Sequence, residues 1–437
     1  MLSLWDNLED LLDSDCPENQ AGTVIHHGEF DPKQDAQTLK EAMDGIGTKE
    51  DILIDILTHR DNAERQLIRK AYQDATGNDL VDDLQSETRG DFEDLVVALV
   101  RTPAEFDCHE VMDAIKGAGT KDSVLIEIFA SRTNQEIKAL NDVHLKEKEY
   151  LLIRDLRDEL NGDIRKAMLL LVEGERDESA DVNEQEAVQD AEAMYQAGED
   201  KWGTDESTFI EILCKKSFPQ IRRTLVKYKN ISEKSLQKSI ESEMSGELEE
   251  LMVAIVKCVK SRPAYFAERL HDSMEGSGTC EATVCRIMVS RSEIDLKNIK
   301  AEYKKLYKRS LLSDIEALIA FHRGFTCTNH NNRVSESREV QCPGDRRRGP
   351  GGHAPPTRRT PLNNRTLHSY HAQAPLVLAR APALSARTLL AEEPLRLLAV
   401  LAANSRSLTE AKTPSSLWRQ RQQQWSMQEE ETPQIKR

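Results

Sequence analysis

Three glutamates share one position relative to a repeated glycine turn. Each lies forty residues after the last glycine of such a turn, and they are Glu87, Glu159 and Glu243. Backbone carbonyls at a sharp turn, together with one carboxylate, offer the hard oxygen ligands that Ca²⁺ prefers. The same step from Gly278, in a fourth turn, reaches Leu318. The spacing therefore predicts three calcium sites that include an acid and a fourth that lacks it.

The glycine turn occurs four times, at 45–50, 117–122, 201–206 and 276–281. Each copy has a glycine, then a threonine, and then an acid two residues later. A single copy is most simply a helix-to-helix turn, because short motifs match often by chance. Three matches of the forty-residue step favour a binding site, although gene duplication could also copy a purely structural spacing.

Apolar residues recur three and four positions apart through residues 31–316, as in Ile52, Ile56 and Leu57. This periodicity predicts helices throughout. Each repeat of about 70 residues is expected to contain a helix that ends in the glycine turn, a second helix, and three more. The threonine hydroxyl of the turn is expected to cap the second helix.

A basic residue follows each turn at a fixed distance, thirteen residues after the last glycine. These cations are Arg60, Arg132, Lys216 and Arg291. A cation at a helix junction can satisfy carboxylates and carbonyls at once. Salt bridges between helices are therefore their predicted role.

The repeat spacing divides the chain into seven regions. They are an N-terminal segment (1–30), repeat 1 (31–102), repeat 2 (103–173), a linker (174–186), repeat 3 (187–261), a truncated repeat 4 (262–316) and a tail (317–437). The tail contains 10 of the 15 prolines and many arginines, so it is predicted to be disordered. Repeat 4 is expected to lack its last helix, which would leave part of its apolar surface uncovered.

Charge separates the tail from the repeats. The whole chain carries −17, and the tail has 18 basic and 9 acidic residues, so residues 1–316 carry −26. No signal peptide is expected, because the first 16 residues are acidic. Apolar stretches such as 95–100 are far shorter than the roughly 20 residues that span a bilayer. A cytoplasmic protein that lies on membranes is therefore the expectation, with no nucleic-acid partner for residues 1–316.

The repeats resemble those of the annexin family, whose signature is this glycine–threonine–acid loop. The match is close at 197–206 and 288–296 and extends over residues 22–316. Within the family the chain most resembles the short-N-terminus vertebrate members, partly through Trp5 and residues 176–179. The resemblance implies an all-α protein in which four repeats of about five short helices form a curved disc.

The resemblance also implies the calcium ligands. In repeat 1 they are the carbonyls of Met43, Gly45 and Gly47 with Glu87; in repeat 2, those of Ile115, Gly117 and Gly119 with Glu159; in repeat 3, those of Gly198, Lys201 and Gly203 with Glu243. In repeat 4, Met274, Gly276 and Gly278 offer carbonyls without an acid, so that site is expected to be weak or empty. Trp202, at the tip of its loop, is expected to enter the membrane interface.

The function implied by this resemblance is calcium-dependent binding to anionic phospholipid as a peripheral membrane scaffold. Self-association on the membrane and inhibition of phospholipase A2 are further implications. An alternative is an ion-conducting or transport role, with a polar path between repeats lined by cations such as Arg60 and Arg291. Enzymatic activity is not expected, because the chain has neither a phosphate-binding P-loop motif nor a His-Glu-x-x-His motif.

Overall fold

The computed structural model is all-helical in the residues that it describes. These residues are 21–24, 30–45, 47–117, 119–199, 203–275 and 280–317. The predicted tail, most of the N-terminal segment, and the position expected for the last helix of repeat 4 lie outside them. Within the described part no strand occurs, as the helical periodicity predicts.

Repeats 1 and 2 each contain five helices. Those of repeat 1 are α2 (Pro32–Met43), α3 (Glu50–Thr58), α4 (Asn62–Thr76), α5 (Leu80–Glu87) and α6 (Gly90–Val100). Those of repeat 2 are α7 (Pro103–Ile115), α8 (Asp122–Ser131), α9 (Asn134–Lys148), α10 (Leu152–Glu159) and α11 (Gly162–Val172). The five-helix prediction for the repeat is therefore confirmed.

Repeats 3 and 4 share one long helix, α16 (Glu247–Met274), which is interrupted at Ser261 by extended backbone with φ −164° and ψ 109°. Before it come α12 (Glu184–Ala197), α13 (Glu206–Lys215), α14 (Phe218–Ser232) and α15 (Leu236–Glu243). After it come α17 (Glu281–Arg291), α18 (Leu296–Tyr307) and a helical segment at 311–317. The chain is therefore helical from Glu184, within the linker predicted at 174–186.

Local sequence signals explain where the third helix of a repeat begins and ends. The helices α4 and α9 begin with reciprocal capping boxes, Asp61 with Glu64 and Thr133 with Glu136. All four third helices end at a residue in the left-handed conformation. These residues are Gly77, Glu149, Glu233 and Lys308, with φ between 59° and 81°. This conformation stops the helix and turns the chain toward the next one.

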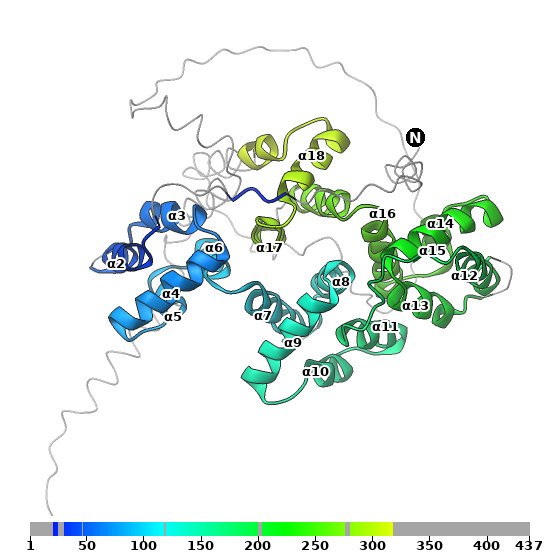
Figure 1. Ribbon diagram of the computed structural model, residues 1–437, viewed down its shortest axis with the longest axis horizontal. Helices are drawn as coiled ribbons and strands as arrows, with labels where there is room; N and C mark the ends of the chain where they lie inside the picture. Colours follow the sequence, from blue (N-terminus) through cyan, green and yellow to red (C-terminus); the bar gives the residue numbers. More distant parts are fainter. Residues whose placement is uncertain are drawn as a thin grey trace, which may run out of the picture.

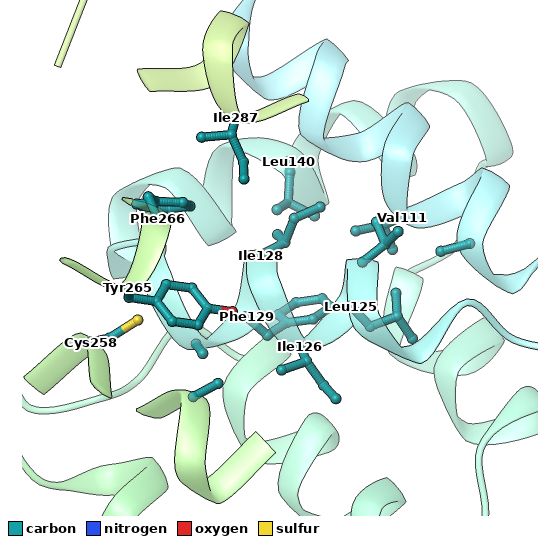
Figure 2. Close-up of a cluster of buried hydrophobic side chains, with 14 of the residues drawn as sticks. Val111, Leu125, Ile126, Ile128, Phe129, Leu140, Cys258, Tyr265, Phe266 and Ile287 are labelled. Atoms are coloured by element: carbon teal, nitrogen blue, oxygen red, sulfur yellow. The ribbon is translucent and has the colours of Figure 1, made fainter. Parts of the chain in front are cut away.

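The four repeats lie side by side rather than stacked, as seen down the shortest axis in Figure 1. Helix α6 of repeat 1 packs against α17 of repeat 4, α8 of repeat 2 packs against α16, and α11 packs against α13 of repeat 3. Figure 2 shows the apolar core where α8 meets the second half of α16, with Phe129 and Tyr265 close together. The repeats therefore bury their apolar faces against one another.

Polar contacts also join the first and last repeats. The Glu293 carboxylate accepts a hydrogen bond from the Asn62 backbone N–H at 2.9 Å and pairs with the Arg65 guanidinium at 3.3 Å. The short segment 21–24 lies against repeat 4, where the Thr23 N–H donates to the Ser292 carbonyl at 2.7 Å. Residues 21–24 are thus attached to repeat 4 beside Glu293, the residue that joins the two ends of the repeat array.

The predicted salt bridges between helices are present. Arg60 binds Asp35 of α2 at 2.8 Å, and Arg132 binds Asp107 of α7 at 2.7 Å. Lys216 pairs in the same way with Glu186 of α12.

In repeat 4 the equivalent cation, Arg291, has a different ion-pair partner. The first helix of this repeat has Phe266 where the earlier repeats have an acid, and the Arg291 guanidinium lies 4.8 Å from the centre of that ring. The charge of Arg291 is instead paired with Asp295, at the start of α18, at 2.7 Å. Arg60 and Arg291, the cations expected to line an ion path, are therefore each paired within their own repeat.

Candidate functional site

All four glycine turns are closed by one equivalent backbone hydrogen bond. In each, an N–H at the start of the second helix donates to a carbonyl at the end of the first. The pairs are Lys49 to Ala42 (2.9 Å), Lys121 to Ala114 (2.8 Å), Asp205 to Ala197 (2.8 Å) and Cys280 to Ser273 (2.9 Å). The turn is therefore a structural feature of every repeat, including the fourth.

The first predicted ligand of each loop directly follows the residue that accepts this closing bond. Met43, Ile115 and Met274 are the last residues of their helices, and Gly198 caps α12. The last four carbonyls of a helix have no partner within the helix. Their oxygens are therefore available as metal ligands.

The glycines of the turns adopt backbone conformations that other residues rarely reach. Gly45 and Gly47 have φ of 109° and 87°, and Gly117 and Gly119 have φ of 106° and 114°. A Cβ atom at any of these positions would meet nothing within 4 Å. Backbone conformation, rather than lack of space, therefore requires glycine here.

Each predicted acid is the last residue of the fourth helix of its repeat. Glu87 ends α5, Glu159 ends α10 and Glu243 ends α15. Glu87 and Glu159 are exposed, and Glu243 is partly buried. The constant step of forty residues therefore reflects one geometry, in which the end of the fourth helix lies next to the glycine turn.

A threonine hydroxyl joins the two parts of the site directly. The Thr48 hydroxyl donates to the backbone carbonyl of Glu87 at 3.1 Å, and the Thr204 hydroxyl donates to that of Glu243 at 3.1 Å. The capping role predicted for these threonines is wrong, because the N-cap residues are Lys49 and Asp205. The hydroxyl instead holds the acid-bearing helix end against the turn.

The loop of repeat 3 is one residue longer than the others. Its closing bond spans eight residues, from Ala197 to Asp205, where the other three span seven. The structure brings Gly198 and Glu243 together, since a Cβ on Gly198 would lie 3.8 Å from the Glu243 Cγ. Glu199, the next residue, accepts a hydrogen bond from the Ser239 hydroxyl of α15. The longer loop is therefore held against the helix that carries its acid.

The sites of repeats 2 and 3 open toward one another. A hollow of about 460 Å³ lies between them. Its lining includes Thr120 and Glu159 from repeat 2 and Glu206 and Glu243 from repeat 3. The two predicted acids therefore lie on the same face of the molecule.

The donor set suits calcium. Each predicted site of repeats 1 to 3 offers backbone carbonyls and one carboxylate, with no nitrogen or sulfur among the predicted ligands. Calcium takes six to eight such oxygens in irregular geometry. Lys201, Trp202, Gly276, Gly278 and the Leu318 position lie outside the described residues.

The repeat architecture matches one protein family. The annexin family model matches four segments of the chain, at 34–99, 106–171, 189–255 and 265–318. The chain belongs to the annexin family. The predicted all-α annexin fold with four repeats is thereby confirmed.

Individual annexins are similar over the same region. Human annexin A3 is 50% identical over 296 residues, which cover 68% of this chain and 92% of that protein. Chicken annexin A5 is 45% identical over 295 residues, which cover 68% of this chain and 92% of that protein. A solved structure of annexin III has a TM-score of 0.67 and 49% identity, with 68% of this chain and 92% of that chain covered. A calcium-bound structure of annexin (Sm)1 has a TM-score of 0.60 and 34% identity. The match covers 68% of this chain and 89% of that chain.

Removing the threonine hydroxyls is expected to weaken the annexin sites of repeats 1 and 3. In Thr48→Val and Thr204→Val, the acid-bearing helix end loses its bond to the turn, so calcium affinity at that repeat should fall by roughly 10–100-fold, the usual effect of losing a group that orients a ligand. Isothermal titration with calcium measures this change. Thr38→Val is the control, because its hydroxyl bonds a carbonyl of its own helix at 2.8 Å. Unchanged calcium binding in both loop variants would contradict the positioning role.

Proposed function

We propose that this annexin binds anionic phospholipid membranes in a calcium-dependent manner, through the carbonyl-and-carboxylate sites of repeats 1, 2 and 3. The observation that supports this most strongly is the threonine bond between the glycine turn and the residue that carries the acid, which is present at 3.1 Å in repeats 1 and 3. It holds the acid-bearing helix end beside the turn, which supports a shared site for ligands that are forty residues apart.

The sites are suited to recruiting an external ligand. A few loop carbonyls and one bidentate carboxylate leave two or three calcium positions for water or a phosphate oxygen. Glu87 and Glu159 are exposed, which supports a location of these positions at the protein surface. A bound calcium ion would supply the positive charge that a lipid phosphate requires.

Net charge makes the binding depend on calcium. Residues 1–316 carry −26, so a negatively charged leaflet repels them without a bridging cation. No helix among the described residues combines the length and apolar character needed to cross a membrane. The protein therefore acts, in this proposal, as a non-enzymatic peripheral scaffold that moves from the cytoplasm to membranes when calcium rises.

Repeat 4 contributes little to this function. It keeps the loop-closing bond between Cys280 and Ser273, at 2.9 Å, but its sequence has Leu318 where the other repeats have glutamate. Without a carboxylate, the remaining carbonyls bind calcium weakly. Membrane attachment is therefore expected to depend on the calcium sites of repeats 1, 2 and 3. Self-association of the bound protein on the membrane surface is a further part of the proposal.

Cosedimentation with vesicles tests the proposal. The full-length protein should pellet with vesicles that contain phosphatidylserine when calcium is present, and should return to the supernatant when a chelator is added. Vesicles of phosphatidylcholine alone are the control for headgroup charge. Binding that a chelator leaves unchanged would refute the calcium-dependent mechanism.

A further inference from the structure

A second kind of metal-ligating cluster lies in repeat 4, at the start of the fourth glycine loop. It consists of His271, Asp272 and Glu275, at the end of α16. The imidazole Nδ1 lies 3.7 Å from a carboxylate oxygen of Asp272 and 3.7 Å from one of Glu275. One ligand atom from each of the three residues lies within 4.8 Å of the others. The three donors are therefore close enough together to share one cation.

We propose that His271, Asp272 and Glu275 form a binding site for Zn²⁺. Zinc accepts imidazole nitrogen and carboxylate oxygen in tetrahedral geometry, with bonds of about 2.0–2.2 Å that place neighbouring ligand atoms roughly 3.3–3.6 Å apart. The two observed distances of 3.7 Å exceed this range by little. Small side-chain rotations therefore suffice to form the site.

The environment of the three residues suits such a site. The His271 ring stacks on Tyr307, with centroids 3.7 Å apart and planes 6° apart, so its orientation is fixed. The side chains of Asp272 and Glu275 are 57% and 72% exposed, respectively, so they can rotate toward a metal ion. The cluster also lies at the C-terminal end of a helix, where the helix dipole favours a cation.

The donor set distinguishes this site from the calcium loops. An imidazole ligand favours zinc over calcium, which prefers oxygen alone. Three protein ligands leave the fourth zinc position to water or another ligand. Glu275 lies between Met274 and Gly276, two predicted ligands of the fourth calcium loop, so the zinc site overlaps the start of the loop that lacks an acid.

Zinc titration of the full-length protein tests the assignment. Metal-free protein is titrated with Zn²⁺ against a fluorescent zinc indicator, without calcium or vesicles, so the result does not depend on the membrane proposal. His271→Ala should lose one equivalent of bound zinc. His109→Ala is the matched control, because its imidazole pairs with the Glu147 carboxylate at 3.5 Å but belongs to no three-ligand cluster among the described residues, so it should retain that equivalent.

The carboxylate variants complete the test. Removing a group that only orients a metal ligand lowers metal affinity by roughly 10–100-fold. Removing a direct ligand, as in Asp272→Asn or Glu275→Gln, should therefore weaken zinc binding at least about tenfold. Zinc uptake that is unchanged in these variants, or that excess calcium displaces, would overturn the proposal. If circular dichroism shows that His271→Ala does not fold, zinc titration of Glu275→Gln, a substitution at an exposed side chain, tests the proposal instead.

Discussion

Replacing Glu87, Glu159 and Glu243 together by glutamine should abolish calcium-dependent vesicle binding at calcium concentrations that saturate the wild-type protein. Glutamine keeps the size of each side chain but removes the bidentate, negatively charged ligand. Because the three sites bind one membrane together in the proposed function, their losses multiply, and we expect the overall affinity to fall by about 100-fold or more. Cosedimentation across a calcium titration measures this effect.

A second triple variant separates ligation from net charge. Asp82→Asn, Asp158→Asn and Glu241→Gln remove the same amount of charge from the same three helices, at exposed positions outside the predicted sites. This control should bind vesicles at wild-type calcium concentrations. If both triple variants lose binding equally, general electrostatics rather than the three sites would explain it.

Replacing Glu127 by glutamine should cause the largest loss of stability, about 3–5 kcal/mol, as expected when a buried charge loses its partner. Glu127 of α8 is completely buried and binds Arg286 of α17 through two bonds, of 2.8 and 3.0 Å. Arg269 adds a contact at 3.4 Å. The substitution leaves the buried Arg286 without full charge compensation between repeats 2 and 4. Chemical unfolding measures the change.

Two further variants control for this result. Glu110→Gln removes a single bond to Arg286, at 3.1 Å, from a side chain that is 28% exposed, so it should cost clearly less. The double variant Glu127→Leu with Arg286→Met removes both buried charges and should recover most of the stability. A Glu127→Gln variant no less stable than Glu110→Gln would contradict a central role for this pair.

The ion pair between Glu127 and Arg286 also predicts how the stability of the protein changes at acid pH. Burial raises the pKa of Glu127, but the guanidinium groups of Arg286, Arg269 and Arg132 together outweigh burial and hold the pKa below its ordinary value. A carboxyl group with a lowered pKa in the folded state stabilises the protein above its unfolded pKa, and this stabilisation is lost as the pH falls through the folded value. The Glu127→Gln variant should therefore lose less stability than the wild type over that acid range.

The helical fold and its repeats were predictable because both leave local patterns in the sequence. Apolar residues at three- and four-residue spacing indicate helices, and four glycine turns indicate the period. The forty-residue step to Glu87, Glu159 and Glu243 was also informative, because it repeats wherever the fourth helix ends beside the turn. The cations after the turns predicted their salt bridges for the same reason.

Contacts that depend on tertiary placement were not predictable. Thr48 has the sequence signature of a helix cap, yet its hydroxyl bonds Glu87, which local sequence cannot reveal. Likewise, the position of Arg291 predicted a salt bridge but not its partner, which changed because Phe266 occupies the place of an acid. The His271 cluster was also missed, although His271 and Glu275 are one helical turn apart, a spacing that could have indicated a metal site.

The most direct test of the central claim is the number of calcium ions bound per chain in the presence of phosphatidylserine vesicles. Equilibrium dialysis with radioactive calcium measures it for the wild type and for the variant with glutamine at Glu87, Glu159 and Glu243. The variant is predicted to bind three fewer ions per chain, one for each of these acids. Equal numbers in the two proteins would contradict the assignment of these residues as calcium ligands.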